Sequence, residues 1–147
     1  PNLTDNDWLY GGDPAAIEAS IFNGRQGAMP GWGPILGEEG VSAAAEYVMS
    51  LSGRDVNQQL AAEGKTKYDA NCAACHGPNG QGNTALGAPN LTDNIWLYGG
   101  SPELIKHSIR NGRSGKMPSH KVLLGEDKVH LLTAYVYSLG RADQKPE

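Results

Sequence analysis

The sequence contains two copies of one segment, and this repeat constrains the fold more than any other feature. Residues 1–51 align with residues 89–139 without gaps at an offset of 88, and 29 of the 51 aligned positions are identical. The strings PNLTDN and WLYGG occur in both copies, as do the pairs Met29-Pro30 and Met117-Pro118. Self-similarity of this extent indicates two copies of one structural module.

The two copies are unequal, because only the second is preceded by a segment that holds two cysteines. We interpret residues 1–52 as the back half of a first module, residues 53–58 as a linker and residues 59–141 as a complete second module, followed by a polar tail at 142–147. The first copy then lacks the segment that completes the second, and we expect it to be the less stable part.

Composition favours a small, loop-rich protein of short helices. The 147 residues include 20 glycines, 9 prolines and a single phenylalanine, so a core built from side chains alone would be thin. The net charge of −4, from 12 basic and 16 acidic residues, argues against a nucleic-acid-binding protein. No apolar run is long enough to span a bilayer and no signal peptide is evident, so we expect a soluble piece of a protein.

The helix signals predict an all-α fold. Each copy has a capping residue followed by proline, at residues 13–14 and 101–102, and a glycine where the helix should end, at residues 24 and 112. No segment alternates with a period of two over any length, so no strand is predicted. Further helices are expected from Glu126 to Leu139, with an apolar stripe of Val129, Leu132, Val136 and Leu139, and from Gln58 to Asn71, with Leu60, Gly64 and Tyr68 at a spacing of four.

The pentapeptide Cys72-Ala73-Ala74-Cys75-His76 is the C-x-x-C-H attachment motif of c-type haem. Two thiols on a short turn can add to the two vinyl groups of one porphyrin, and the adjacent imidazole is a good iron ligand. A thioredoxin-like dithiol would follow a strand, and a zinc site would need two further ligands at the right spacing; neither pattern is visible. A plain disulfide across two residues is rarer still. The sequence therefore predicts one covalent haem c.

The sixth ligand of that iron should come from elsewhere in the chain, and Met117 is the favoured candidate. It lies in a Gly-rich polar loop, which is a poor place for a core methionine. Met29 occupies the same position in the first copy and would serve a first-module haem. His107 and His120 are the rival ligands. His130 is expected on a helix surface, and Met49 in the core.

Other residues are candidates for contacts at the haem edge or propionates: Trp96, Tyr98, Asn111 and Arg113, of which the guanidinium is the best partner for a carboxylate. Basic residues also gather around the Met117 loop and predict a rim that steers an acidic redox partner. These are Lys106, Arg110, Arg113, Lys116 and Lys121.

Residues 59–140 resemble the class I cytochrome c fold. The resemblance rests on Cys72–His76 followed by GPNGQG, on Pro89-Asn90-Leu91 and on Met117-Pro118. The duplicated string PNLTDNxWLYGG, with MPSHK and LGEDKVH, resembles a narrower family across nearly the whole chain: the dihaem CcoP or FixP subunits of cbb3-type cytochrome c oxidases.

This resemblance implies a class I domain of three to five short helices around a haem, preceded by the back half of a homologous domain. It implies Pro89 as the carbonyl partner of His76, a second haem in the intact protein, a membrane anchor outside this chain and a periplasmic location. The role would be electron relay from donor cytochromes to the other subunits of a haem–copper oxidase, without catalysis by this chain. A free soluble dihaem carrier and a haem-based sensor or peroxidase-like protein remain as alternatives.

Overall fold

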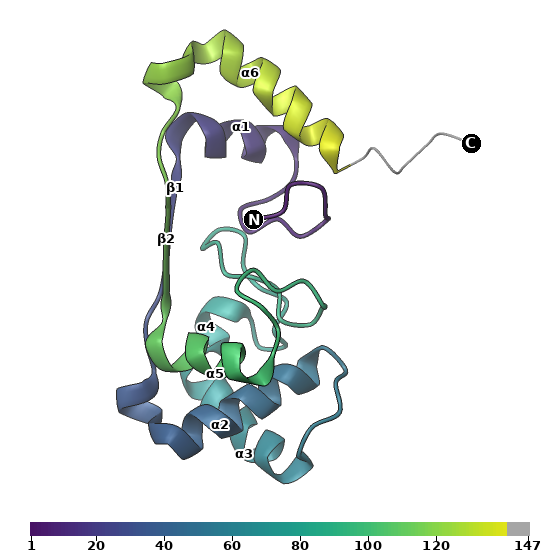
Figure 1. The fold of residues 1–147 in the computed structure, drawn as a ribbon, viewed down its shortest axis with the longest axis vertical. Helices are drawn as coiled ribbons and strands as arrows, with labels where there is room; N and C mark the ends of the chain where they lie inside the picture. Colours follow the sequence, from purple (N-terminus) through teal and green to yellow (C-terminus); the bar gives the residue numbers. More distant parts are fainter. Residues whose placement is uncertain (141–147) are drawn as a thin grey trace, which may run out of the picture.

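The fold is mostly helical, as the sequence predicted. The computed structural model describes residues 1–140, so the predicted tail at 142–147 lies outside the described residues. The elements in order are α1 (Pro14–Asn23), β1 (Arg25–Met29), α2 (Gly33–Leu51), α3 (Gln58–Asn71), α4 (Ala73–His76), α5 (Pro102–Asn111), β2 (Arg113–Met117) and α6 (Lys121–Leu139) (Figure 1).

The predicted caps set the helix boundaries. The Asp13 side chain accepts a hydrogen bond from the Ala16 N–H at 3.0 Å, and α1 ends before Gly24, whose φ of +74° suits glycine. The same arrangement bounds α5 between Ser101 and Gly112. Helix α6 starts five residues earlier than predicted, because a kink at Gly125, with φ of +73°, joins a short first turn to the main helix.

Two strands were not predicted. β1 pairs antiparallel with β2, with Gly27 opposite Gly115 at the centre, Arg25 opposite Met117 and Met29 opposite Arg113. The two strands are equivalent segments of the two copies, so the ribbon is symmetric about its centre. The two strands consist largely of glycine and polar residues, and apolar and polar residues do not alternate along them. This is because the ribbon lies between two helical bodies and does not cover a hydrophobic core.

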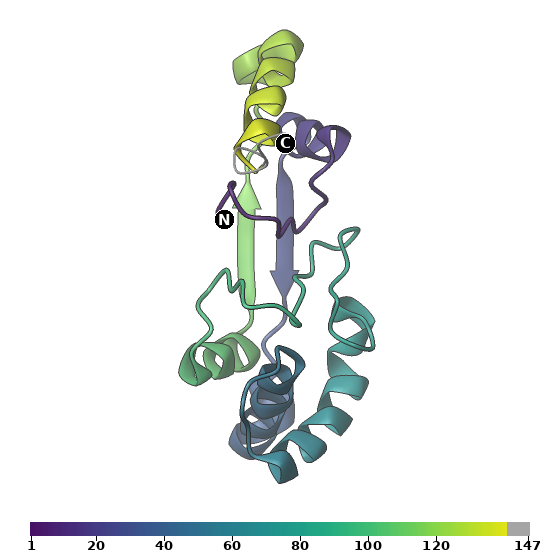
Figure 2. The same cartoon turned by 90° about the vertical axis from the view of Figure 1, so that its right-hand side faces the viewer.

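The ribbon connects two helical bodies at opposite ends of an elongated molecule (Figures 1 and 2). The large body contains α2, α3, α4 and α5; its core includes Val41, Tyr68 and Ile105. The small body contains α1 and α6; its core is Ile17, Ile21, Val129 and Val136. The last helix of each copy therefore packs against the other copy.

This packing crosses the predicted module boundary at 53–58. Helix α2 belongs to the first copy, yet it lies against α3 and α5, and several of its side chains are fully buried there. Residues 1–52 are thus not packed as a separate unit, while the division of the chain into two related modules stays a prediction. In the small body the expected stripe is partial: Val129 and Val136 are buried, and Leu132 is exposed.

Candidate haem attachment site

The cysteine pair and His76 lie on one tight turn at the end of α3. Cys72 ends that helix, its N–H donating to the Tyr68 carbonyl at 2.8 Å, and its own carbonyl accepts from the His76 N–H at 2.9 Å. Cys72 is buried and Cys75 is exposed, and both thiols are free of disulfide bonds. Burial raises the pKa of the Cys72 thiol to about 11, with a smaller contribution from Cys75.

His76 is buried and its ring is held by one hydrogen bond. Nδ1 lies 3.0 Å from the Pro89 carbonyl oxygen. A carbonyl only accepts, so the bond requires the proton on Nδ1 and leaves Nε2 with a free lone pair. Burial lowers the pKa of His76, the carbonyl acting in the opposite sense. A neutral ring with a defined orientation is the form in which histidine binds a metal.

The loop after His76 is fixed from both sides. The Tyr68 side chain is fully buried, and its hydroxyl donates to the Gly77 carbonyl at 2.6 Å. The Gly82 N–H donates to the His76 carbonyl at 2.8 Å. Burial raises the pKa of Tyr68 to about 12, so the hydroxyl stays a donor. Residues 77–89 are thereby held so that the Pro89 carbonyl reaches the imidazole.

The predicted haem-edge residues divide between this body and the ribbon. Trp96 packs against the core of the large body. The Arg113 guanidinium lies over the Tyr98 ring, 4.4 Å from its centroid, and its Nε donates to the Ser108 hydroxyl at 3.0 Å. Asn111 is at the end of α5, where its side-chain amide donates to the His107 carbonyl.

The two candidate methionines lie at opposite ends of the ribbon. Met29 is opposite Arg113, next to α5, and packs against the core cluster that includes Cys72. It lines a shallow groove of about 340 Å³ together with Asn111 and Arg113. Met117 is opposite Arg25, at the end of α1. Met117 thus lies at the far end of the ribbon from the body that holds His76, and its role as the second ligand of the iron stays a prediction.

The remaining predicted ligands do not gather at His76 either. The His120 N–H donates to the Ile21 carbonyl in the small body, and the buried Nδ1 of His120 has no partner among the described residues. His107 is exposed on α5. His130 is exposed with Nδ1 3.5 Å from Glu18, which confirms its predicted surface position, and Met49 is buried in the core as predicted.

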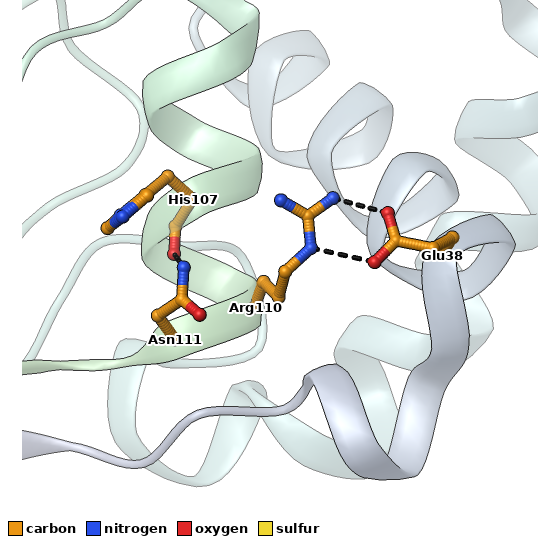
Figure 3. Close-up of polar contacts among 4 residues, drawn as sticks. All are labelled: Glu38, His107, Arg110 and Asn111. Carbon is orange, nitrogen blue, oxygen red and sulfur yellow. Dashed lines mark hydrogen bonds and ion pairs between the residues drawn. The ribbon is translucent and has the colours of Figure 1, made fainter.

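The fold separates three of the residues that were expected to form one basic rim, and the docking role of the rim stays a prediction. Arg110 forms a two-point ion pair with Glu38 of α2 (Figure 3). The Arg113 guanidinium stacks over the ring of Tyr98. Lys121 lies in the small body, 4.8 Å from the centre of the Phe22 ring. Neither the Arg110–Glu38 pair nor the ribbon was foreseen, since both join segments that are remote in sequence.

The residues present fit a covalently bound haem. Two unpaired thiols precede a buried imidazole whose Nδ1 is already occupied by a backbone carbonyl, so that Nε2 is the one nitrogen left for iron. Together with the helical body, this turn defines a c-type cytochrome.

The comparisons with known proteins narrow this class. The family described as "Cytochrome C oxidase, cbb3-type, subunit III" matches residues 1–48 and 59–136, and the chain belongs to this family. The chain is 46% identical to the cbb3-type cytochrome c oxidase subunit FixP of Azorhizobium caulinodans, over 95% of this chain and 51% of that protein. It is also 46% identical to the subunit CcoP of Rubrivivax gelatinosus, over 96% of this chain and 46% of that protein.

The chain spans about half the length of the curated relatives it matches. Among residues 1–140, no helix is both long enough and apolar enough to cross a membrane.

Proposed function

We propose that this chain carries electrons through one covalently bound haem c, as part of a cbb3-type cytochrome c oxidase. The observation that carries the proposal is the buried His76 ring, held by the Pro89 carbonyl directly after two free thiols. Membership of the cbb3 subunit III family supports the same function, and relatives of this chain bear the names FixP and CcoP.

Each residue of the site has a defined role in this function. Cys72 and Cys75 would form the two thioether links to the haem, and Nε2 of His76 would bind its iron. The Pro89 carbonyl fixes the imidazole and increases its basicity. Tyr68 holds the following loop in place through Gly77. When bound, the haem supplies an iron that changes between the ferric and ferrous states.

A methionine from one of the two Met-Pro pairs would supply the other ligand of the iron. A thioether ligand raises the reduction potential relative to a second histidine, which suits a carrier that feeds an oxidase. Arg113 lines the groove together with Asn111 and Met29 and is the proposed partner of a propionate. The sequence favours Met117 as this ligand.

The partners follow from the family. We propose donor cytochromes on one side and the oxidase core on the other, with the chain on the periplasmic face of the inner membrane and the intact protein held there by an anchor. The oxygen chemistry then belongs to another subunit, and a second haem belongs to the first module of the intact protein. The family match favours this function over a free soluble dihaem carrier.

The test is production of the chain in a host that matures c-type cytochromes, followed by intact mass and a redox titration. We expect one haem attached per chain and a reversible one-electron transition. His76→Ala should abolish the low-spin spectrum, while His107→Ala, an exposed histidine on α5, should leave it unchanged. A chain without covalent haem would refute the proposal. Rapid CO binding by the reduced protein would instead favour a sensor or peroxidase-like function.

A further inference from the structure

The loop that leads to Pro89 is closed at its base by hydrogen bonds within the second copy. The Asn83 N–H donates to the Ala88 carbonyl at 2.9 Å, and the Ala88 N–H donates back to the Asn83 carbonyl at 3.1 Å. Ala88 is buried, while residues 83–86 are exposed. Gly87 is the one residue between the exposed part of the loop and Ala88, so its contacts bear directly on where Pro89 lies.

Gly87 is in contact with the side chain of Tyr10, which belongs to the first copy. A Cβ at Gly87 would overlap Cζ of the Tyr10 ring and lie 2.5 Å from its Cε1, so the ring lies directly against the glycine backbone. Gly87 also has a φ of +68°, a conformation that suits glycine. The backbone conformation and the neighbouring tyrosine therefore both require glycine at this position.

The Tyr10 ring is itself held by the first strand of the ribbon. The Arg25 guanidinium lies over the ring, 4.7 Å from its centroid, and Arg25 Nε donates to the Ser20 hydroxyl at 2.9 Å. Gly27, at the centre of β1, leaves space for the Tyr10 hydroxyl, because a Cβ there would lie 3.0 Å from that oxygen. The ring is thus packed between β1 and the loop that leads to Pro89.

The equivalent tyrosine of the second copy has only part of these contacts. The Arg113 guanidinium lies 4.4 Å from the centroid of the Tyr98 ring, but Tyr98 is 44% exposed, whereas Tyr10 is partly buried. A Cβ at Gly115 would lie 3.7 Å from the Tyr98 hydroxyl, which is an ordinary contact. The stacked arginine is therefore common to both copies, and within residues 1–140 the contact with Gly87 is particular to Tyr10.

We propose that Tyr10 of the first copy is a positioning residue for the haem of the second copy. Its ring supports Gly87 and, through that residue, the Pro89 carbonyl that lies 3.0 Å from Nδ1 of His76. A well-placed carbonyl makes the imidazole more basic, and a more basic ligand stabilises ferric iron relative to ferrous iron. The first copy therefore helps to set the reduction potential of a haem that is attached to the second.

The inference rests on the proposed haem binding, and two substitutions of Tyr10 test it. Tyr10→Leu removes the ring, while Tyr10→Phe keeps the ring and removes only the hydroxyl. We expect Tyr10→Leu to raise the midpoint potential. NMR should show exchange of the His76 Nδ1 proton at least about tenfold faster, which corresponds to about 1.4 kcal/mol in the opening equilibrium. Tyr10→Phe should behave like the unaltered protein. Tyr135→Leu, at a 61% exposed position of α6, is the matched control and should change neither quantity.

A substitution in the ribbon tests the same contact without altering Tyr10. Gly27→Ala should displace the Tyr10 hydroxyl, which also adjoins Gly87, and shift the midpoint potential in the same direction as Tyr10→Leu. The double variant Gly27→Ala, Tyr10→Phe lacks the displaced oxygen and should reverse the shift. Gly115→Ala is the equivalent change in the second copy and should leave the potential unchanged, because its Cβ would make an ordinary contact.

The outcomes separate the inference from the function on which it rests. Absence of attached haem in the unaltered chain would refute the proposed function. With haem attached, an unchanged potential and unchanged Nδ1 exchange in Tyr10→Leu would overturn the role of Tyr10 and leave the function intact. An equal effect of Tyr135→Leu would overturn it as well. If Tyr10→Leu does not mature, the ribbon variants decide, and equal potentials in Gly27→Ala and Gly115→Ala would overturn the inference.

Discussion

Replacement of Gly64 by alanine tests how tightly α2 and α3 cross. A Cβ at this position would lie 2.5 Å from the Ala43 carbonyl carbon and 3.0 Å from Cβ of Tyr47, whereas ordinary contacts begin at 3.4 Å. The Ala43 carbonyl oxygen would lie closer still, so the helices would have to separate by more than about 0.9 Å at this point, the difference between 3.4 and 2.5 Å. Most of the obstruction is backbone, so a rotamer change does not relieve it.

Two effects of opposite sign decide the magnitude. Alanine is the better helix former by about 1 kcal/mol. Overpacking in a closely packed core costs about 1–3 kcal/mol, and the upper end applies where backbone must move. We therefore expect Gly64→Ala to lower the free energy of unfolding by about 2 kcal/mol, which corresponds to about 4–8 °C in Tm for a chain of this size.

The assay is thermal and guanidinium unfolding of the holoprotein. Ala62→Gly on the exposed side of the same helix is the control, because it changes propensity alone and should cost about 1 kcal/mol. An alanine at position 64 that left stability unchanged or raised it would show that the crossing is loose.

Two further substitutions test the packing of each body. Tyr68→Phe leaves the Gly77 carbonyl without its donor and should cost about 1 kcal/mol in guanidinium unfolding, whereas Tyr135→Phe at an exposed position should be neutral; equal effects would show that the buried hydrogen bond contributes nothing. Val129→Ala removes two methyl groups from a fully buried position and should destabilise the small body by about 2 kcal/mol. Leu131→Ala at a 70% exposed position should change stability by less than about 0.5 kcal/mol, and a larger loss would mean that α6 is covered.

The local features of the site were predictable from the sequence because each depends on residues close together in the chain. Asp13 and Gly24 are capping residues that predict the two ends of α1. The spacing of Cys72, Cys75 and His76 places all three residues on one turn. The Pro89 carbonyl was expected from the resemblance to cytochromes c, and its position 3.0 Å from the imidazole agrees with that expectation. Helix ends that are set by capping residues and local motifs do not depend on how segments distant in sequence pack together.

The ribbon, and the packing of the last helix of each copy against the other copy, were not predictable in the same way. The strands contain Gly27 and Gly115 at their centre and bury no apolar face, so they lack the alternation by which a strand is recognised. The basic residues near Met117 are close in sequence, but the ribbon carries Arg110 and Lys121 to different bodies. Distance along the chain was therefore a poor guide to distance in the fold wherever the ribbon intervened.

Repetition itself explains why the last helix could not be assigned from pattern alone. A periodicity argument matches an apolar stripe to an apolar partner, and the stripes of α2 and α6 share Val41 and Val129 at the same position. Such identity makes contacts within a copy and between copies nearly equal in free energy, the condition under which segments exchange at low cost. At the crossing of α2 and α3, the atom of Ala43 nearest to a Cβ at Gly64 is the carbonyl oxygen. Leu131 at the equivalent position of α6 also has this oxygen, so the crossing does not distinguish the two copies.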